Sequence, residues 1–114
     1  VNMDVTPRIK EGLNVIQSYK PGQVTAGHTT YDAPVFITSE DVVEDAQITD
    51  IEVYAPERDV VLVAAPEDFS AEEFLKLKQK FSNLEIMSID AACRTFNVLL
   101  TEGRRAGLFI MAQT

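Results

Sequence analysis

The chain has 114 residues, 46% of them hydrophobic and 25% charged, and this size and composition predict a single folded domain over residues 1–114 with a substantial core. Its formal net charge of −8 makes it acidic and argues against nucleic acid or an anionic membrane as a partner, because both attract clustered Lys and Arg. Its apolar runs are far shorter than the roughly 20 residues that cross a bilayer, so no transmembrane segment is expected.

The N-terminal third is predicted to form a small antiparallel hairpin or meander. Residues 1–12 are expected to be a loose arm, with neither the apolar core of a signal peptide nor the Arg-rich, acid-poor pattern of a mitochondrial presequence. In the turn that follows, Pro21 presets φ and Gly22 supplies a positive φ. The expected strands are Val15–Ser18, Gln23–His28 and Val35–Thr38, with a second turn at Tyr31–Pro34.

The middle segment, Ser39–Asp59, is the most acidic part of the chain and has two interpretations. It contains eight carboxylates against the single cation Arg58. Asp45–Asp50 shows no helical stripe, and apolar residues alternate with acids on either side of it. Short edge strands and an irregular excursion fit this pattern equally well. A run of like charges is typical of a face turned to solvent.

A buried strand and a capped helix are predicted next. Val60–Ala65 is a continuous apolar run, which is typical of a strand buried on both faces. Ser70 and Glu73 have the spacing of a capping box, in which the two side chains satisfy free backbone donors at the start of a helix. The sequence therefore predicts a helix that begins after Ser70 and runs to about Phe81.

The C-terminal part repeats this alternation of strand and helix. Leu84–Met87 is predicted to be another buried strand, Asp90 to cap a second helix, and Gly103 to end that helix in a left-handed conformation. Gly107–Met111 is expected to be the last strand. Because a strand–helix–strand crossover is almost always right-handed, the pattern predicts an α/β fold with two helices and the N-terminal hairpin extending the same sheet or packing beside it.

The residue types that carry catalysis or bind cofactors do not form a recognisable set. One His and one Cys, far apart in the sequence, do not suggest a metal site. Cys93 is interpreted as a packed thiol rather than a nucleophile, and His28 as a strand or turn residue rather than a general base. No glycine-rich phosphate loop follows the first buried strand, where the chain has Ala65-Pro66-Glu67-Asp68. We therefore expect no cofactor and no metal.

Four polar residues near the C-terminus are the candidate binding residues. Arg94 and Asn97 are three residues apart and so share a helical face. Arg104 and Arg105 follow the glycine stop, where cations complement a helix C-terminus. Adjacent side chains on the next strand point to opposite sides, so one arginine is expected to face inward and pair with a carboxylate such as Glu102 or one from the acidic middle. A structural ion pair and an anion or partner contact are both compatible with this arrangement.

The segment SIDAACRTFNVLLTEGRRAGLFIMA closely resembles the C-terminal signature of a small family of unknown biochemical function. The matching pattern is E-x-M, then A-C-x-T-[FY]-N-x-L, then E-G-R, and the N-terminal I-x-x-Y-x-P-G hairpin is also similar. The family includes bacterial and archaeal single-domain proteins and the mitochondrial NADH dehydrogenase (complex I) assembly factor three. The chain departs from it in having no tryptophan, and in having Ala64-Ala65-Pro66 where relatives often have a Gly-Thr-Gly-like turn.

The resemblance implies a three-layer α/β fold with a mixed sheet of about five strands. It also implies a protein-binding role and supplies no catalytic residues. Our leading hypothesis is a non-enzymatic interaction or assembly domain, bacterial and cytoplasmic, with an unknown protein partner; a mitochondrial location is expected only for a eukaryotic relative without its presequence. The alternative is an anion-binding domain or weak enzyme that uses a cleft at the C-terminal strand ends with Arg94, Asn97 or Arg104. A self-associating protein, or homo-oligomer, is the third hypothesis.

Overall fold

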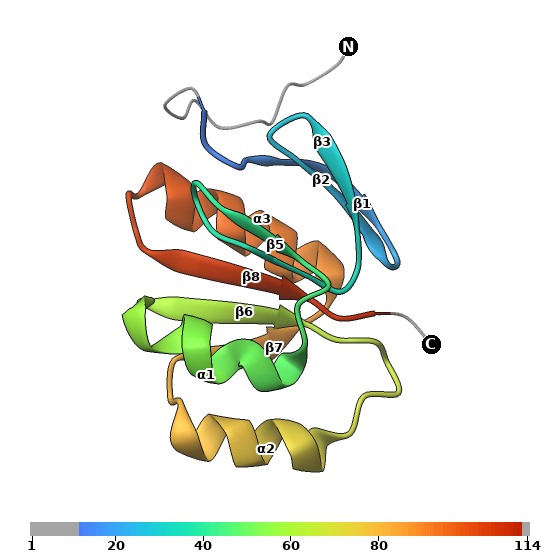
Figure 1. The fold of residues 1–114 in the computed structure, drawn as a ribbon, viewed down its shortest axis with the longest axis vertical. Coiled ribbons are helices and arrows are strands. Elements are labelled where there is room, and N and C mark those ends of the chain that lie inside the picture. Colours follow the sequence, from blue (N-terminus) through green and yellow to red (C-terminus); the bar gives the residue numbers. More distant parts are fainter. Residues whose placement is uncertain (1–11, 113–114) are drawn as a thin grey trace.

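The central strands are apolar at nearly every position, and both of their faces are buried. In the computed structural model, which describes residues 12–112, β6 (Val60–Ala64) and β8 (Ala106–Ile110) lie parallel inside a five-stranded mixed sheet (Figure 1). The strand order is β5-β4-β8-β6-β7. On one side of the parallel pair, β4 (Val35–Ile37) and β5 (Val42–Glu44) are antiparallel, and on the other β7 (Leu84–Met87) pairs parallel with β6.

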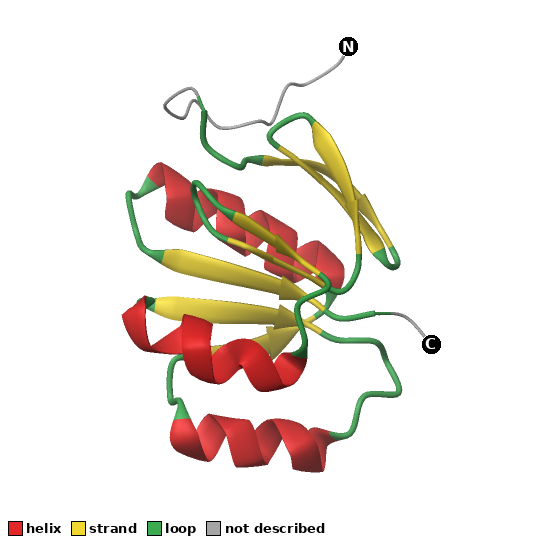
Figure 2. Ribbon diagram, in the orientation of Figure 1, coloured by secondary structure: helices red, strands yellow, loops and turns green. Residues whose placement is uncertain are grey.

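Successive side chains of a strand point to opposite faces, and this alternation produces three layers. Leu62 and Leu108 face the layer that contains α3 (Ile89–Thr101). Val61 and Phe109 face the layer of α1 (Ile51–Tyr54) and α2 (Ala71–Lys80). Figure 2 shows the sheet between these helices, with a second, smaller sheet beside α3. The predicted three-layer α/β fold with a five-stranded mixed sheet is confirmed.

The N-terminal strands form their own three-stranded antiparallel sheet rather than extending the main one. Its strands are β1 (Ile16–Lys20), β2 (Gln23–Ala26) and β3 (Thr29–Asp32), in the order β1-β2-β3.

The boundaries of this small sheet differ from those predicted. Gly27 and His28 have φ values of +55° and +73°, which produce a two-residue turn of the hairpin-favouring kind. The chain therefore reverses earlier than expected, and Tyr31 and Asp32 belong to β3 instead of a turn. The strand expected at Val35–Thr38 is present as β4, but it joins the main sheet next to β8.

A third helix lies in the acidic segment that the sequence left open. The interpretation as a short edge strand holds for β5, and the rest of the segment is helical. Two 3-10 turns, η1 (Ile48–Asp50) and η2 (Ala55–Glu57), flank α1. The buried side chain of Ile51 anchors this helical segment on the face opposite α3. The prediction of two helices was therefore incomplete.

The predicted helix starts need two corrections. Ser70 is the N-cap of α2, but its side chain makes no capping hydrogen bond, so the predicted capping box with Glu73 does not form. The N-cap of α3 is Ser88, whose Oγ accepts a hydrogen bond from the Ala91 N–H at 3.2 Å. Asp90 lies inside the first turn instead, where a negative charge favours the positive end of the helix.

The predicted stop of α3 at Gly103 is confirmed. Gly103 has φ of +70°, its N–H donates to the Leu100 carbonyl at 3.0 Å, and the Arg104 N–H donates to the Leu99 carbonyl at 2.9 Å. These two bonds satisfy carbonyls that a helix end otherwise leaves free.

β7 was predicted to be another buried strand, but only its first residue, Leu84, is buried. It is an edge strand, and Ile86 is 40% exposed. Lys78 of α2 covers part of this edge, because its Nζ donates to the carbonyls of Leu84 (2.6 Å) and Ser82 (2.7 Å). Covering an edge strand with a side chain from a neighbouring helix protects it against pairing with another chain.

The expected loose arm, residues 1–12, lies outside the described residues except for Gly12. Among residues 12–112, no helix has the length and apolar character needed to cross a membrane.

Candidate functional site

Asn97 ties α3 to the edge strand of the small sheet. Its Oδ1 accepts a hydrogen bond from the Ile16 N–H at 2.9 Å, and its Nδ2 donates to the Ile16 carbonyl at 3.0 Å. The amide thus pairs with β1 much as a neighbouring strand would. Asn97 was predicted as a binding residue, and in the structure its polar atoms are used inside the fold.

Arg94 and Asn97 line the same groove, as their spacing on one helical face predicted. The groove has a volume of about 470 Å³ and runs between β1 and α3. Its rim includes Tyr19, which is 38% exposed, and Val98, which is 55% exposed. Its lining consists of Ile16, Gln17, Tyr19, Cys93, Arg94, Asn97, Val98 and Thr101.

Asp90 links the two walls of this groove. Its Oδ1 accepts hydrogen bonds from the Tyr19 hydroxyl on β1 and from the Arg94 Nε on α3, the latter at 3.0 Å. The Arg94 side chain remains 77% exposed. Among residues 12–112, only its Nε has a protein partner, so both terminal amino groups are available to a ligand or partner.

Arg104 and Arg105 do not line the groove. Both lie beyond the C-terminal end of α3, and both pair with Asp59, at 3.7 Å and 3.8 Å. The Arg105 backbone N–H also donates to Asp59 at 3.0 Å. A carboxylate from the acidic middle was one of the predicted partners, but neither arginine faces inward, because their side chains are 51% and 71% exposed. Exposed pairs of this kind stabilise a fold by less than about 1 kcal/mol.

Cys93 is a packed thiol, as interpreted from the sequence. Its side chain is 2% exposed. Burial, and secondarily the negative charge of Asp90, raise the pKa of the thiol to about 12. Because the thiolate is the nucleophilic form, this environment opposes covalent catalysis by Cys93.

His28 lies in the exposed turn between β2 and β3, as the turn interpretation proposed. Its backbone N–H donates to the Gln17 side chain at 3.1 Å. Within residues 12–112, no three His, Cys, Asp or Glu side chains lie close enough together to hold a metal ion.

A larger cleft opens where the three parallel strands end. The last residues of β6, β7 and β8, which are Ala64, Met87 and Ile110, all line it, and its volume is about 760 Å³. The chain leaves β6 toward α2 on one face of the sheet and leaves β7 toward α3 on the other. Such a point, where connections diverge, is where open α/β sheets commonly bind ligands.

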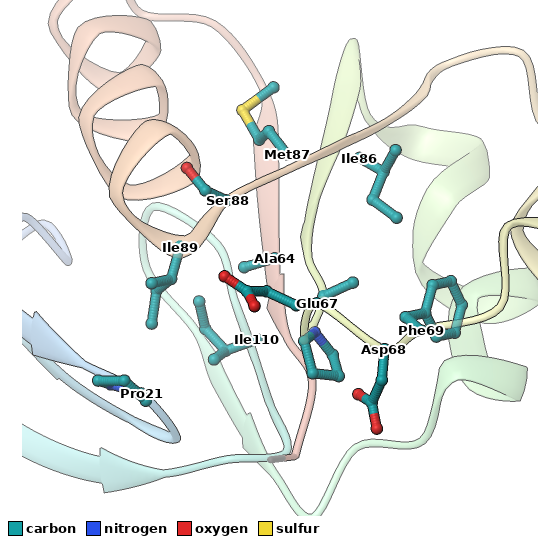
Figure 3. Close-up of a pocket in the computed structure, with 12 residues that line it drawn as sticks. Pro21, Ala64, Glu67, Asp68, Phe69, Ile86, Met87, Ser88, Ile89 and Ile110 are labelled. Carbon is teal, nitrogen blue, oxygen red and sulfur yellow. The ribbon is translucent and has the colours of Figure 1, made fainter. Parts of the chain in front are cut away.

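The side chains of this cleft are those that the sequence analysis did not select. The turn after β6 contributes Glu67, which extends toward Ile89 and Ile110, and Asp68, whose side chain points away from these two residues (Figure 3). A cleft at the strand ends was predicted with Arg94, Asn97 or Arg104 as anion contacts, but none of these residues lines it, nor does Arg105. The sequence did contain a sign of this cleft, the turn Ala65–Asp68 after the first buried strand. That turn was interpreted only as evidence against a phosphate loop.

These features define a three-layer α/β domain that carries a ligand-sized cleft at its strand ends and a groove beneath a small accessory sheet. The sequence places it more specifically. Residues 16–111 match the family described as "Protein of unknown function (DUF498/DUF598)", and the chain belongs to this family.

Solved structures with the same fold come from several bacteria. An outer membrane protein from Bartonella henselae is 22% identical, with a TM-score of 0.68 over 90% of this chain and 97% of that one. A Xanthomonas campestris protein is 19% identical, with a TM-score of 0.67 over 96% and 92% of the two chains. A Bordetella pertussis protein described as an Mth938-like domain is 18% identical, with a TM-score of 0.63 over 96% and 92%. No curated protein matches the sequence.

Proposed function

We propose that this chain is a non-enzymatic protein-binding domain of the assembly type, and that its partner docks in the groove between β1 and α3. The main support for this proposal is the set of side chains that line the groove. Tyr19 and Arg94 stand at its rim, and these two residue types are enriched among those that dominate protein–protein binding energies. Val98 adds exposed apolar area beside them.

The family resemblance supports the same role. The motif that resembles the mitochondrial complex I assembly factor three, a protein-binding factor, includes Cys93, Phe96 and Asn97. These residues lie on α3, the helix that forms one wall of the groove. Asn97 holds the opposite wall, β1, in place. The motif therefore builds the surface at which the proposal places the partner.

Two valines provide a matched test of the docking site. Val98 on α3 is 55% exposed in the groove, whereas Val53 on α1 is 73% exposed in the opposite layer. The full chain, tagged and cross-linked in its native cell, should recover a partner whose yield falls at least about tenfold with Val98→Asp, if the valine lies in a desolvated interface. Val53→Asp should leave the yield unchanged. Equal yields for the two variants would argue against the groove.

Self-association is the competing use of the same surface. Sedimentation of the wild-type chain at two concentrations distinguishes the two, because a homo-oligomer changes its apparent mass with concentration. A dimer that Val98→Asp dissociates would mean that the partner is a second copy of this chain.

Anion binding at Arg94 is the second candidate function. It is favoured by the two terminal amino groups of Arg94, which stand free of protein partners within residues 12–112 at the rim of the groove. Thermal unfolding with added phosphate or a dicarboxylate tests it. Stabilisation that Arg94→Gln abolishes and Arg104→Gln preserves would support the anion site, since Arg104 lies outside the groove.

A further inference from the structure

We propose that the cleft at the strand ends is a separate binding site for a small organic cation: an ammonium group that pairs with Glu67, attached to an apolar body. This inference does not depend on the proposed protein-binding function, because none of the described residues, 12–112, lines both the cleft and the β1–α3 groove. It rests on the position of the cleft, the character of its lining and the sign of its charge.

The position is the one at which an open α/β sheet leaves room for a ligand. Three parallel strands end here together, and α2 and α3 leave the sheet on opposite faces. The cleft has a volume of about 760 Å³, which lies within the usual range of roughly 300–1,000 Å³ for small-molecule sites.

The lining is apolar over most of its surface. Ile86 from the edge strand is 40% exposed at its side, and Pro21 from the β1–β2 turn closes the side nearest the small sheet. The full apolar set is Pro21, Ala64, Ala65, Pro66, Phe69, Ile86, Met87, Ile89 and Ile110. A ligand that fills this space must therefore carry an apolar body.

The ionisable groups of the lining have one sign. Among residues 12–112 they are Glu67 and Asp68, and no Lys, Arg or His in this part of the chain lines the cleft. Glu67 extends into the space beside Ile89 and Ile110 (Figure 3), and none of the salt bridges within residues 12–112 involves it. A carboxylate in a mostly apolar cleft without described cations favours a cation and repels an anion.

The start of α3 does not reverse this preference. A helix N-terminus attracts anions, and Ser88 and Ile89 from this end line the cleft. Asp90 already places a carboxylate in the first turn, however, and the Ser88 hydroxyl accepts one of the free N–H groups. The partial positive charge of this helix end is therefore already partly offset by Asp90 and Ser88, and Glu67 keeps its preference for a cation.

Three probes with the same six-carbon chain separate the contributions of charge and apolar body: hexylammonium, hexanol and hexanoate. Binding to the full-length chain is followed by NMR titration, with the amide signals of Ala64, Met87 and Ile110 marking the cleft. We expect hexylammonium to bind most tightly, hexanol less tightly and hexanoate most weakly. Glu67→Gln should weaken hexylammonium binding about threefold to fivefold, the effect of one exposed ion pair, and leave hexanol binding unchanged.

Two further variants act as controls. Ile86→Gln, at an exposed position of the lining, should weaken hexylammonium and hexanol alike, because it removes apolar contact without changing the charge. Glu102→Gln, which removes a carboxylate outside the cleft, should change nothing. Hexanoate binding as tightly as hexylammonium, hexylammonium binding that ignores Glu67→Gln, or no shifts at the cleft amides with any probe would each overturn the proposal.

Discussion

Replacing Asn97 with Ala should cost this protein much of its stability. The change removes two hydrogen bonds, to the Ile16 N–H at 2.9 Å and to the Ile16 carbonyl at 3.0 Å. Each bond contributes about 1 kcal/mol, and leaving a poorly solvated backbone group unpaired adds about 1–3 kcal/mol. Because Ile16 is only 6% exposed, water cannot fully replace the amide. We expect Asn97→Ala to lower the free energy of unfolding by about 2–4 kcal/mol.

Urea denaturation followed by circular dichroism measures the loss, and hydrogen exchange locates it. The Ile16 amide should exchange faster in Asn97→Ala than in wild type, while the amides of β6 and β8 change only in step with global stability. Thr101→Ala is the control, because it removes a hydroxyl that bonds only within α3, to the Asn97 carbonyl, and should cost less than about 0.5 kcal/mol. A loss below about 1 kcal/mol for Asn97→Ala would refute the view that its amide holds β1 against α3.

Three further changes test the packing of the core, the end of α3 and the buried thiol. A Cβ at Gly107 would lie 2.6 Å from Phe36 Cζ, so Gly107→Ala should lower the free energy of unfolding, measured in urea, by about 1–3 kcal/mol. Adding Phe36→Leu should recover part of this loss, and strictly additive losses for the two substitutions would contradict the contact. Gly103→Ala meets no atom within 4 Å but must adopt φ of +70°, so its thermal unfolding should show a loss of only about 1 kcal/mol. The folded chain keeps the Cys93 proton up to about pH 12, while the unfolded chain loses it near pH 9.0. The free energy of unfolding should therefore fall as the pH rises between these values, by up to about 1.4 kcal/mol per pH unit relative to Cys93→Ala. Identical pH dependence of the free energy of unfolding in the two proteins would contradict the raised pKa.

Local chemistry made some features predictable from the sequence. The apolar run of β6 has to be buried on both faces, and Gly103 can adopt the left-handed conformation that ends α3 at no steric cost. The shared face of Arg94 and Asn97 follows from helical geometry alone. Each of these features depends on residues within a few positions of one another.

Features that depend on distant partners were not predictable in the same way. The group that Asn97 binds lies 81 residues earlier in the chain. The place of β4 beside β8 brings the Phe36 ring to within 2.6 Å of where a Cβ at Gly107 would lie, so it depends on a glycine in β8, far along the chain. The only sign in the sequence that β7 is an edge strand was the charged Glu85 among Leu84, Ile86 and Met87. The three apolar residues favoured a buried strand instead.

The residues by which the family is recognised have mainly structural roles. Phe96 is fully buried, Cys93 packs into the core from the inner face of α3, Asn97 binds β1, and Gly103 ends the helix. A relative that keeps these residues will keep the architecture whatever it binds, because none of them needs a ligand for its role. Differences in function should then arise at positions that the fold leaves open. In this chain the rim of the groove and the carboxylate of the cleft are such positions, and exchanging them between relatives should change what is bound while the fold remains.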